Sequence, residues 1–324
     1  MRTAILSDIH GNYPALMKVL EDARAERVDN FIFLGDYSVY DFPWPNEVAQ
    51  ELMKIENAYF IRGNKEEYMP RFRETNPDEV INDRDGGLYW SVRSLTQKAY
   101  DFQHGLEDEM YIRLAPTVLV YAKHHLPISR TANGDHMPNK FCDYNFFRKA
   151  MAEKPFTHEV FLAEYHDYIN SDSCLPYIQS IEANIIMYGH NHIQAHAYCG
   201  DKLIINPGSC GQPADGNNKA AYTILEITNN GYHVIEKRVA YDIEAAITYI
   251  RSSELYKKAR IISELNIHEM RTGIMNTHLL TDIIGEIATA KNEAHKGLQC
   301  SDATWAEAGE RFIAKYNSTV FKGE

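Results

Sequence analysis

The sequence predicts an α/β protein with a parallel sheet at its start. Short apolar runs at 4–6, 31–34 and 58–61 alternate with stretches of helical periodicity. This β-α-β-α-β order implies parallel strands joined by right-handed crossovers. Each run is followed at once by polar residues and glycine, and the carboxyl ends of such strands are where α/β proteins bind ligands. The fold class and the position of the functional site therefore follow from the same pattern.

Two helices are expected between these strands. The first helix has Asn12 as its predicted N-cap and Pro14 in its first turn. Its apolar positions recur at helical spacing: Leu16, Val19, Leu20 and Ala23. The second helix is predicted to begin near Asn46, behind two prolines, and to end near Ile55.

Residues 66–114 are expected to form a helical insertion beside the site. One apolar stripe runs through this stretch, and we identify no strand signal in it. The stripe contains Leu88, Val92, Leu95, Ala99 and Phe102. Core packing and shaping of the substrate pocket both remain open as roles for the insertion.

The rest of the chain reads as more strands and then as helices only. Further strands are predicted at 117–121, 184–187, 195–199, 203–205, 221–227 and 232–239. Asp242 is the expected cap of a first C-terminal helix, and apolar residues at helical spacing recur after it. We therefore expect a core at 1–241 and a helical appendage at 242–324 that packs on the core or mediates association.

Composition narrows the classes of function. The chain has 324 residues, 44% of them hydrophobic, and a net charge of -12, so a protein that coats nucleic acid or an anionic membrane is not indicated. No apolar run approaches the ~18 to 20 residues of a membrane span. Asp8 and His10 interrupt the first apolar run before it reaches the length of a signal peptide. The five scattered cysteines lack CxxC spacing and favour a reducing compartment. We expect a cytoplasmic protein.

Seven polar side chains at predicted strand ends form the strongest functional pattern. They are Asp8, His10, Asp36, Asn64, His124, His190 and His192. Each has an ordinary explanation alone, as a turn residue or a strand-end histidine, but their joint position at one sheet predicts a metal centre. Imidazole with carboxylate and amide oxygens suits Mn, Fe, Zn, Co or Ni. Seven ligands exceed the needs of one ion, and two ions ~3.5 to 4 Å apart would activate a bridging hydroxide and clamp a phosphoryl oxygen. Cys210 is an alternative nucleophile, but no base is spaced to activate it.

The order of these motifs resembles the calcineurin-like metallophosphoesterases. The motifs are Asp8-x-His10, Gly35-Asp36, Gly63-Asn64, His124 and Gly189-His190-x-His192. Ser-Asp-Ile-His-Gly-Asn at 7–12, Pro45-Asn46-Glu47, and Asn-Pro-Gly-Ser at 206–209 with Gly-Gln-Pro at 211–213 are similar to the bacterial phosphodiesterase branch. The resemblance covers about residues 1–250.

The resemblance implies a four-layer α-β-β-α sandwich, with the parallel strands in one sheet and the later β segments in the other. It also implies which residues share an ion. One ion would be held by Asp8, His10, Asp36 and His192. The other would be held by Asp36, Asn64, His124 and His190, so that Asp36 would bridge. Manganese is the favoured metal.

Two positions depart from the family pattern. Lys65 stands where many relatives have a histidine that acts on the leaving group, and a lysine donates a proton well only if its pKa is lowered. The alternative is a solvent-exposed lysine at the start of a helix. His125 follows the ligand His124, where this branch often has glycine, and is the second candidate acid. Asn12 is a candidate contact to the substrate phosphate, besides its capping role.

The expected function is hydrolysis of phosphoric esters, with diesters favoured over monoesters and a small or nucleotide-like substrate. The alternative is a binding or scaffold protein on the same fold, which Lys65 and the helical appendage would suit. A complete set of seven convergent ligands argues against that alternative. The oligomeric state is left open.

Overall fold

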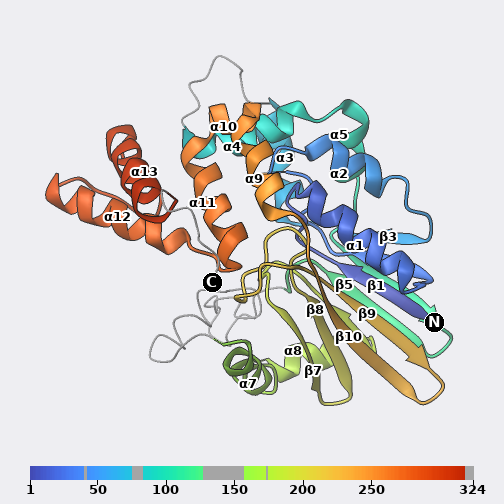
Figure 1. Cartoon of the computed structure of the whole chain (residues 1–324). Coiled ribbons are helices and arrows are strands. Elements are labelled where there is room, and N and C mark those ends of the chain that lie inside the picture. Colours follow the sequence, from blue (N-terminus) through green and yellow to red (C-terminus); the bar gives the residue numbers. More distant parts are fainter. Residues whose placement is uncertain (40–41, 75–82, 127–156, 173, 318–324) are drawn as a thin grey trace.

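Two five-stranded sheets pack face to face in the computed structural model of the chain, and helices cover both outer faces (Figure 1). The structure describes residues 1–39, 42–74, 83–126, 157–172 and 174–317. The predicted four-layer α-β-β-α sandwich is confirmed.

The first sheet has the strand order β10-β9-β1-β2-β3. Its strands are β1 (Arg2–Leu6), β2 (Asn30–Phe33), β3 (Ala58–Phe60), β9 (Ala220–Thr228) and β10 (Gly231–Val239). The first three strands are parallel, as predicted, with Ile5 opposite Ile32. The expectation that all later β segments form the second sheet is wrong, because β9 pairs antiparallel with β1 and β10 with β9. Strand β1 is buried, so its second edge needs a partner for its backbone N–H and C=O groups.

The second sheet has the order β4-β5-β6-β8-β7. Its strands are β4 (Glu109–Ala115), β5 (Val118–Lys123), β6 (Ile185–Met187), β7 (Gln194–Cys199) and β8 (Lys202–Pro207). The three central strands are parallel, and the two edge strands run antiparallel to their neighbours. The predicted ligands therefore come from strand ends of two sheets and not of one.

Strand β4 lies inside the stretch that was predicted to contain no strand. Its side chains alternate, with Ile112 buried and its neighbours Tyr111 and Arg113 exposed. An edge strand of this kind places half of its residues in water. Met110, Ile112 and Leu114 alternate with exposed residues, which is the period of two that marks a half-buried strand, and the sequence analysis missed this signal.

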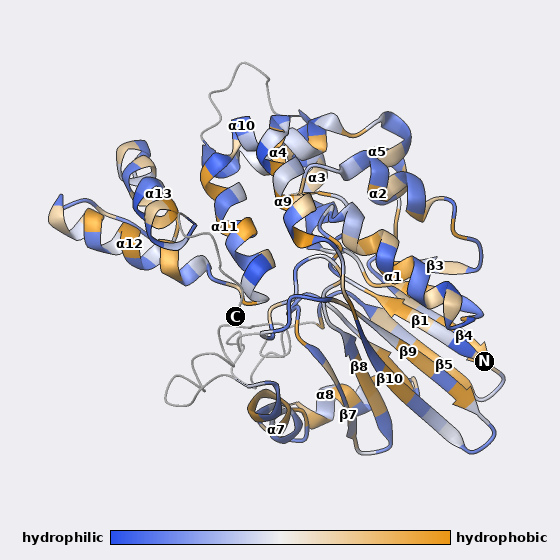
Figure 2. Cartoon of the chain, in the orientation of Figure 1, coloured by the Kyte–Doolittle hydropathy of each residue, from blue (hydrophilic) through white to orange (hydrophobic). Residues whose placement is uncertain are grey.

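Three apolar layers hold the sandwich together. The layer between the sheets includes Ile5, Ile32, Val120, Ile185, Met187 and Leu203. Helices α1 (Tyr13–Ala25) and α2 (Pro45–Leu52) cover the first sheet, and α7 (His158–Ile169) and α8 (Leu175–Ser180) cover the second. Hydrophobic residues concentrate in the strands and on the helix sides that face them (Figure 2). The predicted cap of α1 is confirmed, since the Asn12 side chain accepts a hydrogen bond from the Ala15 N–H.

The insertion contains α3 (Asn64–Glu74), α4 (Asp83–Ser94) and α5 (Gln97–His104). The single predicted stripe is divided between α4 and α5, because Thr96 accepts a hydrogen bond from the Ala99 N–H and starts a new helix. Leu88, Val92 and Ala99 still share one buried cluster, so the core-packing role is confirmed. Residues 75–82 of the insertion lie outside the described residues.

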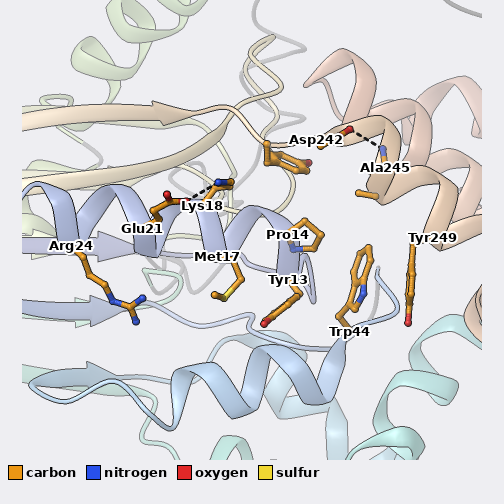
Figure 3. A pocket seen from close by; sticks show the side chains of 12 residues that line it. Tyr13, Pro14, Met17, Lys18, Glu21, Arg24, Trp44, Asp242, Ala245 and Tyr249 are labelled. Carbon is orange, nitrogen blue, oxygen red and sulfur yellow. Dashed lines mark hydrogen bonds and ion pairs between the residues drawn. The ribbon is translucent and has the colours of Figure 1, made fainter.

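The C-terminal part is helical as predicted. It consists of α9 (Ile243–Ser252), α10 (Glu254–Lys258), α11 (Arg260–Thr272), α12 (Thr277–Ala290) and α13 (Asp302–Tyr316). Asp242 caps α9, and α9 lies beside Trp44 and the start of α1 across a groove of about 750 Å³ (Figure 3). Helices α12 and α13 pack on α11 and project away from the sheets (Figure 1). The division at 241/242 stays a prediction, and residues 318–324 lie outside the described part of the chain. No helix in that described part is long and apolar enough to cross a membrane.

Candidate metal centre

The seven predicted ligands converge at one edge of the sandwich. They follow β1, β2, β3, β5 and β6, from both sheets. Two clusters of donor atoms result, and within each cluster the atoms lie within 4.8 Å of one another. We call Asp8, His10 and His192 the Asp8 group. We call Asp36, His124 and His190, together with the neighbouring Asn64, the Asp36 group.

Asp36 lies between the two groups. Its Oδ2 is 3.5 Å from His124 Nε2 and 3.8 Å from His10 Nε2, which belongs to the other group. Asn64 Oδ1 lies 3.2 Å from His124 Nε2 and 2.8 Å from His190 Nδ1. The carboxylate of Asp36 thus lies close to nitrogen donors of both groups, and its role as a shared ligand stays a prediction.

Backbone carbonyls orient two of the imidazole rings. His124 Nδ1 lies 2.6 Å from the Leu34 carbonyl oxygen, and His192 Nδ1 lies 2.7 Å from that of Gln212. A carbonyl oxygen only accepts, so each Nδ1 donates and each Nε2 keeps its lone pair for a neutral ring. Metal-binding histidines are held in this way.

The Asp8 carboxylate supplies a second sign that a cation fits here. Its Oδ2 accepts a hydrogen bond from the His190 N–H at 3.0 Å. Its Oδ1 is buried without a hydrogen bond, and His192 Nε2 lies 3.3 Å away. A buried carboxylate oxygen without a donor is costly. A divalent ion among these donors would remove that cost.

The two buried carboxyls keep low pKa values. Burial by itself would raise the pKa of Asp8, but the neighbouring His192 and His124 imidazoles hold it well below the usual range. Burial likewise works against ionisation of Asp36, and the charge of His124 outweighs it, so the pKa of Asp36 is also lowered. Both side chains are therefore anionic, as carboxyl metal ligands have to be.

The pKa values of two imidazoles, those of His124 and His190, shift in opposite directions. Burial disfavours the charged ring of His124, but the Asp36 carboxylate raises its pKa to about 9. Burial and the neighbouring His124 lower the pKa of His190 to about 3. In the metal-free chain one proton on His124 thus balances part of the carboxylate charge, and metal binding would displace such a proton.

The backbone is strained at the predicted ligands. Among the described residues, five of them have a positive φ: Asp8 (54°), His10 (52°), Asp36 (56°), His190 (71°) and His192 (61°). This conformation is uncommon for residues other than glycine and costs roughly 1–3 kcal/mol at each position. Glycines allow the close approach of the loops, since a Cβ on Gly63 would lie 2.1 Å from Asp36 Oδ1. Strain of this kind clusters at functional sites.

Glu66 is a site residue that the sequence analysis missed. Its carboxylate is buried and accepts hydrogen bonds from the N–H groups of Asp36 (2.9 Å), Tyr37 (2.9 Å) and Gly63 (2.7 Å). Burial and the nearby Asp36 raise its pKa. The sequence shows Glu66 only as an acidic residue in the first turn of a predicted helix. This position is common for Glu and does not indicate a functional role.

Residues 208–218, which we call the cover loop, hold the segment around Asp8 through hydrogen bonds. Ser209 Oγ donates to the Asp8 carbonyl oxygen at 2.7 Å and accepts from the Gln212 N–H at 2.7 Å. The Gly211 N–H donates to the same Asp8 oxygen at 3.0 Å. Cys210 is buried and its pKa is raised by that burial, so its thiol is a poor nucleophile.

The two candidate acids lie next to the ligands. Lys65 is half-buried, and its backbone N–H donates to Asp36 Oδ1 at 2.9 Å. His125 is half-buried, its ring centre is 5.6 Å from that of His190, and burial lowers its pKa. Their catalytic roles stay predictions.

Asn12 is buried beside the Asp8 group. Its Oδ1 caps α1, and its Nδ2 donates to the Gly211 carbonyl (2.8 Å) and to Tyr241 Oη (3.1 Å). These bonds give the amide a structural role, and its contact with substrate stays a prediction.

Comparison with known proteins identifies the family. The family model described as calcineurin-like phosphoesterase matches residues 1–194. An uncharacterized protein of Methanocaldococcus jannaschii, MJ0912, is 26% identical over 261 residues, which cover 78% of this chain and 93% of the relative. A metallophosphoesterase of Sphaerobacter thermophilus superposes with a TM-score of 0.56 at 20% identity, covering 85% of this chain and 99% of that one. The hypothetical protein PH1004 of Pyrococcus horikoshii OT3 superposes with a TM-score of 0.57 at 18% identity, covering 82% of this chain and 97% of that one. The chain belongs to the calcineurin-like phosphoesterase family.

Proposed function

We propose that the chain is a metal-dependent phosphoesterase that prefers phosphodiesters to monoesters. The observation that carries the proposal is the pair of adjacent donor groups, in which Asp36 of one group also lies close to His10 of the other. Two divalent ions would be held there, one by each group, with manganese favoured. When bound, such ions supply an activated water and positive charge for the phosphoryl oxygens.

The protein's own residues prepare this site for an anionic substrate. The net charge of -12 repels phosphate at long range, so attraction has to come from the site itself. Lys65 and His125 lie beside Asp36 and His190, and either would place a proton or a positive charge near the leaving group. Cys210 is buried and gives no support to a covalent route. A small or nucleotide-like ester is the substrate class we favour.

The proposal is tested with bis(aryl) phosphodiester and aryl monoester substrates in the presence of Mn²⁺. We expect hydrolysis of both, faster for the diester. Asp36→Asn removes the shared carboxylate and should lower kcat/KM by more than about 100-fold, since loss of groups that only support ligands already costs 10–100-fold. Asp201→Asn, in the exposed β7–β8 turn, is the matched control and should change nothing.

Failure of the metal-loaded chain to cleave either ester, with no difference between wild type and Asp36→Asn, would overturn the proposal. A binding or scaffold protein on this fold remains the alternative. Elemental analysis separates the two, because a scaffold has no need of two ions per chain. The buried Asp8 Oδ1 without a hydrogen bond favours the enzyme.

A further inference from the structure

The cover loop connects the Asp8 group to helix α11 of the C-terminal part. On one side, the Gln212 carbonyl accepts a hydrogen bond from His192 Nδ1 at 2.7 Å. The Ala214 N–H donates to the His192 carbonyl at 3.1 Å. The loop thus holds His192 by its ring and by its backbone.

On its other side, Gln212 is held by two buried residues of α11. Its Nε2 donates to Glu269 Oε2 at 2.9 Å and faces Asn266 Oδ1 at 3.4 Å. Glu269 and Asn266 are three residues apart and therefore share one face of the helix. Glu269 Oε1 also accepts the Asn276 N–H at 2.6 Å, which fixes the carboxylate at both oxygens.

The end of α11 is joined to the same loop. The Gly216 N–H donates to the Gly273 carbonyl at 2.8 Å, and Asn218 Nδ2 donates to the Arg271 carbonyl at 3.0 Å. Gly273 has a φ of 65°, and a Cβ there would lie 2.6 Å from the backbone of Asn217. This close approach leaves little freedom between helix and loop.

We propose that Glu269 is a positioning residue for the metal centre. Through the Gln212 side chain it fixes the carbonyl that orients His192, so that α11 sets the affinity of the Asp8 group for its ion. The inference rests on the proposed two-ion site. It concerns one ion of the two, because the Asp36 group is fixed from other elements, by Glu66 and by the Leu34 carbonyl.

A purely structural role for Glu269 makes a different prediction, and the chain offers a matched control. Glu264 is on the same helix and is equally buried, at 2% exposed against 4% for Glu269. Its carboxylate binds Arg251, Tyr256 and Asn317, on elements away from the cover loop. Loss of Glu264 should loosen α11 without changing what holds His192.

The experiment is a titration of the metal-free full chain with Co²⁺, followed by calorimetry and by the visible absorption of the bound ion. We expect wild type to bind two ions. Glu269→Ala should weaken one of them by about 10–100-fold and change its absorption band, with the second ion unaffected. Glu269→Gln keeps an acceptor oxygen for Gln212 and should recover part of the loss. Glu264→Ala should bind both ions as wild type does.

Wild-type affinity of Glu269→Ala for both ions would overturn the inference. Loss of one ion from Glu264→Ala to the same extent would also overturn it, because helix docking alone would then be responsible. A wild-type chain that binds no ion would overturn the two-ion site itself. If Glu269→Ala does not fold, Gln212→Leu replaces it, since it keeps the carbonyl and removes only the amide. Undiminished binding by Gln212→Leu would then contradict the inference.

Discussion

The two donor groups differ in the parts of the chain that hold them. The Asp36 group is fixed by nearby residues, with Glu66 bonded to the N–H of Asp36 and Asn64 beside His124 and His190. The Asp8 group is fixed by the cover loop and α11, which lie beyond the residues that match the family model. One half of the site is therefore held by segments close to the ligands, and the other half also depends on the C-terminal helices.

This difference has a consequence for stability. A site built from distant segments forms only when those segments pack together. Its ion therefore binds the folded chain and not the unfolded chain, and so stabilises the folded state. The ion of the Asp8 group should accordingly stabilise the contact between α11 and the cover loop. The following predictions test the two halves and the elements that hold them, beginning with the largest expected effect.

Glu66→Ala is expected to have the largest effect. It leaves three buried N–H groups without an acceptor, at about 1–3 kcal/mol each. The raised pKa of Glu66 means that relief of a buried charge offsets part of this loss. We expect the free energy of unfolding in urea to fall by about 3 kcal/mol. Because Asp36 lies next to both groups, both ions should weaken, in contrast to the single ion that Glu269→Ala affects.

The control for Glu66→Ala is Glu67→Ala, at the exposed neighbouring position. It should keep wild-type stability and metal content. Selective loss of only the Asp8-group ion in Glu66→Ala would contradict the division between the two halves.

Glu264→Gln should change the stability of the C-terminal helices in a pH-dependent way. Burial would raise the pKa of Glu264, but hydrogen bonds from Arg251 and Tyr256 hold it below its ordinary value. Arg251 is 38% exposed, so solvent screening limits the gain to about 1 kcal/mol at pH 7. A carboxylate with a lowered pKa stabilises above its unfolded pKa of about 4.3, and that contribution is lost as the pH falls through the folded value.

The measurement is thermal unfolding of wild type and Glu264→Gln between pH 3 and pH 7. The difference in Tm between wild type and Glu264→Gln should be largest at neutral pH and should disappear in acid. A difference that grows on acidification would have the wrong sign and would contradict the assignment. Metal content should be the same in both proteins at pH 7.

Asn12→Ser should have a modest effect on stability and on activity. Serine can still cap α1, but the hydrogen bonds of Nδ2 to Gly211 and Tyr241 are lost, at about 0.5–1.5 kcal/mol each. We expect a modest loss of stability and less than about a tenfold loss of kcat for the diester. A fall in kcat of more than about 100-fold, with metal content unchanged, would instead identify Asn12 as a contact to substrate.

Local patterns in the sequence were enough to predict which polar residues converge and which residues cap the helices. Asp8, Asp36 and His124 could be identified because strand ends and turn residues are signalled within a few positions. Asn12 and Asp242 could be identified as caps for the same reason. The functions of Glu66 and Glu269 could not, because a glutamate at a helix start or within a helix is ordinary until its partners are known.

The sequence by itself determined the α/β class, the convergent polar set and most of the order of strands and helices. Only the tertiary structure decided that β9 and β10 complete the first sheet, and that α11 reaches the site through Gln212. The physical reason is the distance along the chain over which each kind of interaction acts. Periodicity and capping depend on neighbours along the chain, whereas sheet edges and buried hydrogen bonds are completed by whichever distant segment packs against them.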